Sequence, residues 1–308
     1  MTLAKAALVV NPVSANGLTR KRWPEIASAF EKEGLPYVYS FTEAPGHATE
    51  LTLRYLKEGY KLVVSVGGDG TANEVINGFF TDKEAAPRDR AFGYISTGTG
   101  GDLGRTIGTP RGILEAVQHL VRCPPRPVDV GRVTFINNFG KEEIRYFINV
   151  AGLGLDGDIV DRVNRTSKAL GGFFSFLWGT VVSLLLYQNQ NMAITVDDKM
   201  VVDEPITFVA IGNGCYFGGG MKVAPNALMD DGFFDIIILQ NLSKIKLLLN
   251  LHRVYRGTHL THPLITSLQG RKITVNSKGT ALLNLDGEQP GRAPAEIELL
   301  PQAINLKG

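Results

Sequence analysis

The stretch that decides the fold is LVVSVGGDGTANE, which runs from Leu62 to Glu74. Its first residues form an apolar run that is typical of a buried strand, and this run stops at Gly67 and Gly68. A helix is predicted to begin at Thr71. Glycines let backbone N–H groups approach phosphate oxygens closely, and a helix N-terminus adds partial positive charge. The stretch therefore predicts a phosphate-binding turn between a strand and a helix.

Asp69 lies in the middle of this predicted anion site. A carboxylate is unfavourable there unless a cation bridges it to the phosphates, and Mg²⁺ is the cation we expect. The sequence contains no GxxxxGK[ST] motif, which excludes a P-loop protein. A tight turn in which Asp69 caps a helix would use the same residues, so that alternative stays open.

A second loop of the same kind follows the next predicted strand, which ends at Ser96. It reads STGTGGDLGR and contains Asp102. The carboxyl ends of neighbouring parallel strands face one crevice, where ligands of open α/β sheets bind. Two carboxylates beside a polyphosphate suit metal-assisted phosphoryl transfer.

The organisation of the chain changes at Cys123–Pro127, where three prolines occur within four residues and cannot continue a helix. Before this joint, strand and helix patterns alternate, which predicts an α/β domain with a parallel sheet over residues 1–126. After it, strand patterns dominate, which predicts a larger antiparallel β-sandwich over residues 127–308. Whether the last residues return to the first domain stays open.

The predicted elements of both parts can be given by residue range. Those of the first part are strands 6–11, 37–41, 62–66 and 92–96 and helices 18–33, 46–58 and 71–80. Those of the second part are strands 128–135, 144–150, 192–196, 206–212, 233–239, 273–275, 281–285 and 295–299, with helices near 156–186 and 244–256.

Two acidic turns in the second part are further candidate sites. Asp286 and Glu288 flank a glycine between two predicted strands, a pattern that also occurs in plain hairpins. Asp231 follows a Gly-rich loop and precedes a strand, and its carboxylate together with loop carbonyls could hold a hard cation. A solvated acidic turn is the alternative for Asp231.

Bulk properties narrow the class of protein. The net charge of +2 over 308 residues gives no global field that would attract nucleic acid, so no nucleic-acid partner is expected. Cys123 and Cys215 are far apart and belong to no CxxC motif, which argues for a reducing compartment. The N-terminus does not resemble a signal peptide, so the cytoplasm is expected.

An apolar segment, LGGFFSFLWGTVVSLLLY, covers residues 170–187. Its length approaches that of a membrane-spanning helix, but it contains three glycines, two serines and a threonine. It could be a span, a buried core helix or a lipid-facing helix. Exposure of this segment would favour peripheral membrane contact or a homodimer.

Taken together and in this order, the motifs resemble the diacylglycerol kinase catalytic-domain family, which includes bacterial lipid kinases and sphingosine kinases. They are Asn11–Pro12, the GGDGTxNE run, the second Gly-rich loop, Pro225–Ala227 with Asp231–Gly232, and Asp286–Glu288. The resemblance covers nearly the whole chain. It implies an α/β nucleotide-binding domain joined to a larger β-rich domain, with the site in the cleft between them.

The resemblance also implies roles for individual residues. The residues implied in binding ATP are Asn11, Thr42, Gly67, Gly68, Asp69, Gly70, Thr71, Asn73 and Thr99. An acidic network of Asp69, Asp102 and Asp129 would organise the catalytic Mg²⁺. Glu288 would be the general base, with Asp286 as the competing candidate. Asp231 and the carbonyl groups of Leu228 and Phe233 would bind a second, structural Mg²⁺.

One position departs from the family pattern. The second loop usually reads GTxND, and Gly101 stands here in place of the asparagine. The change removes an amide that could hydrogen-bond to the ligand or the loop.

The resulting hypothesis is a lipid kinase that uses ATP and Mg²⁺ and works at a membrane surface on a lipid hydroxyl such as that of diacylglycerol. One alternative is a small-molecule kinase related to NAD kinase or phosphofructokinase, since both also use a GGDG loop. Another is a catalytically weak regulator that binds nucleotide or lipid.

Overall fold

The computed structural model describes residues 5–80, 89–98, 100–165 and 186–308, except for the side chains of 163–165. The chain divides into two compact units. Unit 1 comprises Met1–Asp129 and Pro301–Gly308, and unit 2 comprises Val130–Leu300.

Unit 1 is built on a parallel sheet. Its elements are β1 (Ala6–Val10), α1 (Ser14–Lys32), β2 (Tyr37–Phe41), α2 (His47–Lys57), β3 (Leu62–Gly67), α3 (Asp69–Phe80), β4 (Ala91–Ser96), α4 (Asp102–Ile107), α5 (Ile113–Arg122) and the end of β14 (Glu288–Lys307). The strand order is β14–β4–β3–β1–β2, and each neighbouring pair is parallel. The carboxyl ends of β1, β3 and β4 therefore lie at one edge of the sheet.

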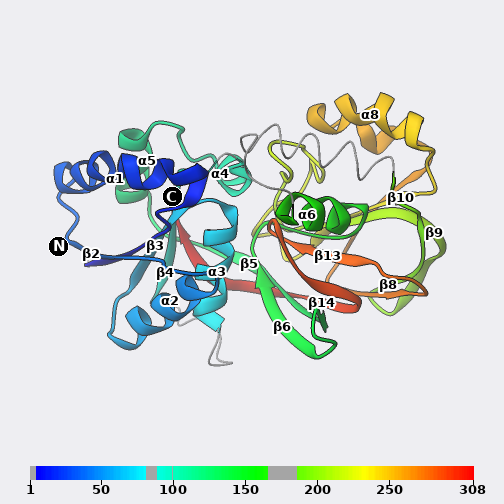
Figure 1. Cartoon of the computed structure of the whole chain (residues 1–308), viewed down its shortest axis with the longest axis horizontal. Coiled ribbons are helices and arrows are strands. Elements are labelled where there is room, and N and C mark those ends of the chain that lie inside the picture. Colours follow the sequence, from blue (N-terminus) through cyan, green and yellow to red (C-terminus); the bar gives the residue numbers. More distant parts are fainter. Residues whose placement is uncertain (1–4, 81–88, 99, 166–185) are drawn as a thin grey trace. The chain divides into compact units, whose positions relative to one another are not determined.

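Helices cover both faces of this sheet (Figure 1), with α1 and α5 on one face and α2 and α3 on the other. Phe30 of α1 and Val117 of α5 share one buried cluster with Val64 of β3. On the other face, a Cβ at Gly78 of α3 would lie 2.5 Å from the Thr52 side chain of α2. Only glycine allows α2 and α3 to approach so closely.

The boundaries of two helices differ from the sequence predictions, and two further helices were not predicted. Helix α3 begins at Asp69 rather than at Thr71, so Asp69 and Gly70 of the GGDG motif belong to the first turn of the helix. Helix α1 begins at Ser14, ahead of left-handed residues at Ala15 and Asn16. The pattern of residues 71–80 and 18–33 could not reveal these starts, because the early turns carry no apolar period. Helices α4 and α5 were missed.

Unit 2 is antiparallel. Its elements are β5 (Arg126–Asn137), β6 (Glu142–Phe147), β7 (Val150–Gly154), α6 (Leu155–Arg165), β8 (Gln190–Val196), β9 (Lys199–Gly212), β10 (Phe234–Gln240), α8 (Lys244–Arg256), the 3₁₀ helix η2 (His259–Thr261), β11 (Ile265–Gly270), β12 (Lys272–Ser277), β13 (Leu282–Leu285) and β14. The pairings β7–β9–β8–β12–β14–β13–β7 close into a ring, and β10 and β11 extend it from β9. Inward-facing residues such as Phe147, Ile211 and Ile273 form its buried core.

One predicted strand, 144–150, is wrong as a single element, because the structure has two strands there, β6 and β7. The chain leaves the ladder at Ile148 and Asn149. Their backbone N–H groups, together with that of Val150, donate to the carboxylate of Asp286, at 2.9, 3.0 and 2.9 Å. A side chain 136 to 138 residues away thus replaces the strand partners.

Most of the apolar segment 170–187 lies outside the described residues, so the alternatives predicted for it are not addressed. Among the residues that the structure does describe, no helix combines the length and the apolar character that crossing a bilayer requires.

Candidate active site

Three loops of unit 1 meet at the carboxyl edge of its parallel sheet. The N–H groups of Thr97 and Gly98 both donate to the carbonyl of Gly67, at 2.8 and 3.2 Å. The Asn11 N–H donates to the Val66 carbonyl at 2.9 Å. The loops after β1, β3 and β4 are therefore joined by backbone hydrogen bonds.

The two Gly-rich loops touch through their backbones. A Cβ at Gly98 would lie 2.7 Å from the Cα of Gly68. A Cβ at Gly67 would lie 2.6 Å from the hydroxyl of Thr71, which accepts a 3.0 Å hydrogen bond from the Asn11 amide. Glycine at these positions lets the backbone of one loop lie directly against the other, which leaves main-chain N–H groups within reach of a phosphate.

Asp69 joins the two loops through its carboxylate. Oδ1 accepts hydrogen bonds from the Leu103 N–H at 3.1 Å and from the Tyr94 hydroxyl at 3.2 Å, and Oδ2 accepts one from the Asp102 N–H at 3.1 Å. Asp69 thus caps the N-terminus of α4, whose own N-cap residue supplies no side-chain hydrogen bond. The capping alternative is observed, but on a different helix from the one that Asp69 begins.

Tyr94 of β4 holds Asp69 by a hydrogen bond from its hydroxyl. Its ring is buried, and burial raises the pKa of its hydroxyl well above the usual value, with the charge of Asp69 acting in the same direction. The hydroxyl therefore stays protonated and donates to the carboxylate. The sequence analysis did not identify Tyr94.

Asp102 brings a second carboxylate to the same place. Its Oδ1 accepts a 2.9 Å hydrogen bond from the Arg105 guanidinium, which also donates to the Gly100 carbonyl. A Cβ at Gly100 would lie 3.0 Å from Oδ2 of Asp69 and 3.9 Å from Oδ2 of Asp102. Two carboxylate oxygens therefore face one small space that glycine leaves open.

This pair fits a hard cation, because Mg²⁺ is usually held by one or two carboxylates together with the phosphates of a nucleotide. Within the described ranges, no group of three or more His, Cys, Asp or Glu side chains could hold a metal ion. Asp69 and Asp102 would therefore need further oxygen ligands, such as those of phosphates, to complete the coordination of a Mg²⁺ ion.

Asp129 accepts a hydrogen bond from the returning end of the chain. It is fully buried, and its Oδ1 accepts a 2.7 Å hydrogen bond from the N–H of Gln302, a residue with a positive φ of 50°. This bond holds the returning end of β14 in unit 1. Asp69 is hydrogen-bonded to the backbone N–H of Asp102, and the place of Asp129 in an acidic network with these two residues stays a prediction.

Gly101, the residue that departs from the family pattern, has a φ of 61°. Glycine and asparagine are the residues that adopt this left-handed conformation most readily. A Cβ there would lie 2.9 Å from the Ser96 hydroxyl. The backbone requirement at this position is therefore met by Gly101, and the cap that an asparagine could supply comes from Asp69.

The remaining residues predicted to bind nucleotide fall into three groups. Gly70 is half-buried in the first turn of α3, and Thr42 lies beside the end of β1, where its N–H donates to the Val10 carbonyl at 2.8 Å. Asn73 is 2% exposed and accepts from Asn77 within α3, so its side chain faces the interior. Thr99 lies outside the described residues.

Glu74, the last residue of the GGDGTxNE run, has a role that was not predicted. Its two carboxylate oxygens accept the N–H groups of Gly46 and Ala48, at 2.9 and 3.0 Å. Glu74 therefore caps α2 from α3. The signal in the sequence was the lack of a capping side chain at Gly46, which leaves the first N–H groups of α2 in need of an acceptor.

In unit 2, the turn between β13 and β14 consists of Asp286 and Gly287, with φ of 49° and 94°. Asp286 is buried, and its two oxygens accept the three N–H groups at the β6–β7 break. Glu288 is exposed at the start of β14. Of the two candidates for the base, Asp286 already serves as an acceptor for the backbone, whereas Glu288 lies at the surface.

A buried carboxyl group supports this turn from α6. The Asn284 side-chain NH₂ group donates to Oδ2 of Asp156 at 2.7 Å, and the Asn284 side-chain oxygen accepts a hydrogen bond from the Gly287 N–H at 2.9 Å. Burial raises the pKa of Asp156 to about 7, while the hydrogen bond from Asn284 opposes the rise. The position of the turn is thus linked to a carboxyl group that changes charge near neutral pH.

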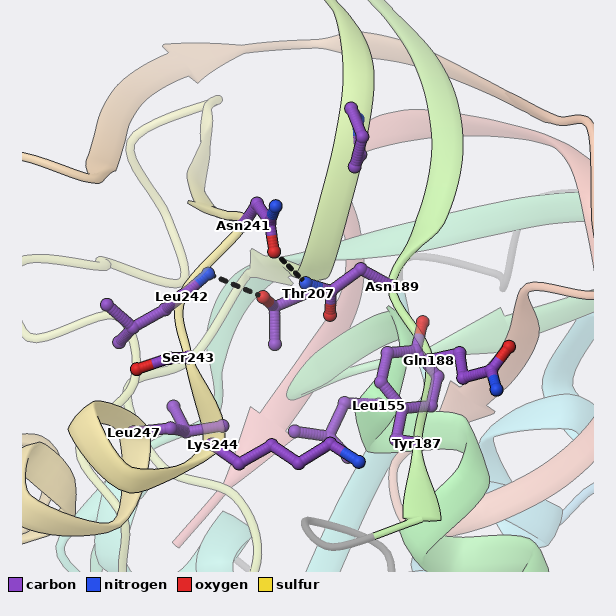
Figure 2. A pocket seen from close by; sticks show the side chains of 11 residues that line it. Leu155, Tyr187, Gln188, Asn189, Thr207, Asn241, Leu242, Ser243, Lys244 and Leu247 are labelled. Atoms are coloured by element: carbon purple, nitrogen blue, oxygen red, sulfur yellow. Dashed lines mark hydrogen bonds between the residues drawn. The ribbon is translucent and has the colours of Figure 1, made fainter.

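A pocket of about 510 Å³ opens beside the N-terminus of α6. Figure 2 shows Leu242 and Leu247 on one side, with Leu155 and Tyr187 on the other. Polar groups of the wall are paired with each other, as where the Leu242 N–H donates to the Thr207 hydroxyl. Leu155 precedes Asp156, so the pocket wall is continuous with the residues that support the Asp286–Gly287 turn.

The turn predicted to hold a second, structural Mg²⁺ has hydrogen bonds of its own. Asp231 Oδ1 accepts the Phe233 N–H at 3.0 Å, while Leu228 is exposed. The Arg271 guanidinium donates to the Gly232 carbonyl at 3.0 Å and lies 4.5 Å from the centre of the Phe233 ring. A side-chain cation therefore contacts this turn, and the structural Mg²⁺ at Asp231, Leu228 and Phe233 stays a prediction.

Comparisons with known proteins agree with this arrangement. The family model of the diacylglycerol kinase catalytic domain matches residues 5–133, and that of the YegS C-terminal NAD kinase beta sandwich-like domain matches residues 149–308. These matches confirm the predicted fold class of an α/β domain followed by an antiparallel β domain.

Relatives cover almost the full chain. A diacylglycerol kinase of Staphylococcus carnosus is 30% identical over 304 residues, which cover 98% of this chain and 94% of the relative. A diacylglycerol kinase of Bacillus subtilis is 29% identical over 308 residues, which cover 99% and 96%. A crystal structure of a diacylglycerol kinase from Bacillus anthracis covers 100% of this chain and 98% of its own, with a TM-score of 0.76 at 24% identity. That structural likeness shows the fold.

Proposed function

We propose that this chain, which belongs to the diacylglycerol kinase catalytic-domain family of lipid kinases, transfers the γ-phosphate of ATP to the hydroxyl group of a lipid such as diacylglycerol. The observation that carries the proposal is the meeting of two Gly-rich loops in unit 1, where Asp69 and Asp102 face the space beside Gly100. This arrangement offers backbone donors for phosphates and carboxylates for a metal ion.

The nucleotide is bound by the loops of unit 1. Its phosphates would lie against the backbone at Gly67 and Gly68 and near the N-terminus of α3, where the helix dipole favours negative charge. The hydroxyl of Thr71, held by Asn11, lies beside the same backbone. Asp69 fixes the second loop by its hydrogen bonds to the start of α4, so that both loops are positioned before ATP arrives.

Asp69 and Asp102 would hold Mg²⁺ together with the phosphate oxygens. When bound, the ion would neutralise the charge of the phosphates during transfer. Arg105 offsets part of the repulsion between the two carboxylates by its contact with Asp102.

Glu288 is proposed as the general base. It would accept the proton of the lipid hydroxyl while the hydroxyl oxygen forms a bond to the γ-phosphorus and the bond from that phosphorus to the β-γ bridging oxygen breaks, releasing ADP. Asp286 would position Glu288, because the Asp286 carboxylate fixes the turn that immediately precedes Glu288. The pocket beside Leu155 and Leu247 is proposed to take part of the apolar tail.

The experiment is ATP-to-acceptor phosphate transfer with Mg²⁺. The acceptors are diacylglycerol, a sphingoid base, phosphatidylglycerol and a monoacylglycerol in detergent, with NAD as the non-lipid acceptor. Glu288→Gln is compared with Glu204→Gln, which changes an exposed carboxylate of β9 in the same unit. We expect transfer to one lipid class and a loss of about 10²–10⁴ in kcat for Glu288→Gln alone.

Two results would contradict the proposal. Transfer to NAD but to no lipid would make the chain a small-molecule kinase with the same phosphate-binding loops. Full lipid transfer by Glu288→Gln would remove Glu288 from its role while leaving the lipid kinase assignment intact.

A further inference from the structure

Helix α8 presents an apolar face to solvent. None of its thirteen residues, all of which the structure describes, is buried. Ile245, Leu248, Leu249 and Tyr255 are 74%, 54%, 67% and 45% exposed. Ile245 is three and four residues from Leu248 and Leu249, and Tyr255 lies two turns after Leu248. All four therefore lie on one side of the helix, which we call the α8 outer face.

The opposite side of α8 attaches the helix to unit 2. Leu247 packs against the buried cluster that contains Leu155, and the Val254 carbonyl accepts the Lys222 N–H at 3.1 Å. Leu251 and Val254 are half-buried. Because this inner side anchors the helix, the outer face points away from the part of unit 2 on which α8 packs.

Helix α5 differs from α8 in how its apolar side chains are placed. Four of them, Ile113, Ala116, Val117 and Leu120, are buried, and Leu114 is 38% exposed. Exposed apolar side chains that line one face of a helix mark an interaction surface.

The charge around the outer face identifies its partner. The sequence contains no Asp or Glu between Asp235 and Asp286, although the whole chain has a net charge of only +2. Within α8, Lys244, Lys246 and Arg253 lie on the flanks of the outer face, and Arg256 lies at its C-terminal end. An exposed apolar stripe with basic residues on its flanks is the pattern of a helix that lies in the interface of an anionic bilayer.

We propose that the α8 outer face is the surface by which this protein binds a bilayer of anionic phospholipids, with the helix parallel to the membrane plane. This inference rests on the proposed function, because it supplies the contact through which a lipid acceptor would be reached. Lys244 and Leu247 at the start of α8 also line the 510 Å³ pocket, so bilayer contact brings that pocket to the lipid. A second copy of the chain is a poorer partner, since a two-fold contact would place like charges together.

The test is binding of the full chain to vesicles of phosphatidylcholine alone or of equal parts phosphatidylcholine and phosphatidylglycerol, measured by flotation. Leu249→Gln is compared with Met200→Gln, which changes a 62% exposed side chain next to the β8–β9 turn. Lys246→Gln is compared with Lys199→Gln, an exposed lysine of the same hairpin. Both control positions lie in unit 2 but outside α8.

We expect Leu249→Gln to weaken binding to anionic vesicles about tenfold and Lys246→Gln to weaken it about fivefold. The Lys246 effect should vanish on phosphatidylcholine vesicles or in high salt. The two control variants should bind like the wild type.

Phosphate transfer to a short-chain diacylglycerol in solution, measured on the same variants, separates the two proposals. Unchanged transfer with weakened vesicle binding supports the α8 surface. Wild-type vesicle binding by both α8 variants overturns the α8 proposal and leaves the kinase proposal standing. A dimer that dissociates in the Leu249→Gln variant would also overturn the α8 proposal, because the outer face would then bind a second copy of the chain. Normal α8-dependent binding without transfer to any lipid overturns the proposed function instead.

Discussion

Asp69 in unit 1 and Asp286 in unit 2 occupy similar places, since each lies in a glycine-containing turn and each carboxylate accepts backbone N–H groups from a distant segment. Asp69 accepts those of Asp102 and Leu103, and Asp286 accepts three from the β6–β7 break. They differ in burial, since Asp69 is half-buried and Asp286 is 8% exposed.

The difference in burial separates a residue that is available for chemistry from one that is not. Oδ2 of Asp69 faces the space beside Gly100, next to the second carboxylate of Asp102. The oxygens of Asp286 accept hydrogen bonds from three buried backbone N–H groups, which would lose their acceptor if the carboxylate were removed. The same residue type in the same kind of turn therefore serves the fold in unit 2 and, in our proposal, a ligand in unit 1.

The largest effect on stability is expected for Asp286→Asn. Asparagine tolerates the left-handed backbone. Its NH₂ group, however, would face a backbone N–H group that now donates a hydrogen bond to the carboxylate, so two donors would face each other. We expect the free energy of unfolding to fall by about 3 kcal/mol. Asp69→Asn, the matched variant, should lower it by about 1 kcal/mol, and urea unfolding compares the two. Equal losses would mean that burial does not distinguish these aspartates.

The next effect is a pH dependence that originates at Asp156. Its pKa is about 7 in the folded protein and 3.8 in the unfolded chain, so the folded state binds more protons between these values. Stability from this group is therefore full below about pH 4 and falls by about 1.4 kcal/mol per pH unit up to about pH 7. Asp156→Asn should flatten this part of the profile. A profile that Asp156→Asn leaves unchanged would contradict the assignment.

A smaller effect is expected for Tyr94→Phe, which removes one of the three donors to Asp69 and leaves the ring in place. We expect a loss of about 1 kcal/mol in stability and a decrease of severalfold in kcat, because Asp69 keeps its two backbone partners. Thermal unfolding and steady-state kinetics measure both. A complete loss of activity would show that the hydroxyl does more than support the carboxylate.

The smallest effect is expected for Gly101→Asn, which restores the residue of the family pattern. Asparagine accepts the φ of 61°, but its Cβ would press on the Ser96 hydroxyl, so stability should change by less than about 1 kcal/mol. Gly98→Ala is the contrasting control, because its Cβ would meet the backbone of Gly68. ATP affinity, measured by calorimetry, should fall for Gly98→Ala and hold for Gly101→Asn.

The sequence predicted those features that depend on local pattern. The apolar run before Gly67 and the period of residues 244–256 were sufficient to place β3 and α8. The fold class followed from the alternation of strands and helices before Cys123 and from the strand patterns after it. Family resemblance was visible because its motifs keep their order along the chain.

Features that depend on distant contacts could not be predicted. The partners of Asp69 lie 25 to 34 residues away, and those of Asp286 lie more than a hundred residues away. For this reason the sequence left Asp286 as a competing candidate beside Glu288 for the base, and it showed one strand where β6 and β7 are separate. The capping role of Glu74 was missed on the same ground.

The measurement that tests the account most directly is kcat for ATP-dependent phosphorylation of diacylglycerol by Asp69→Asn, with urea unfolding of the same sample. We expect kcat to fall at least about 10³-fold while the protein remains folded. A folded Asp69→Asn variant that keeps kcat within tenfold of the wild type would contradict the assignment of Asp69 to the phosphate and metal site.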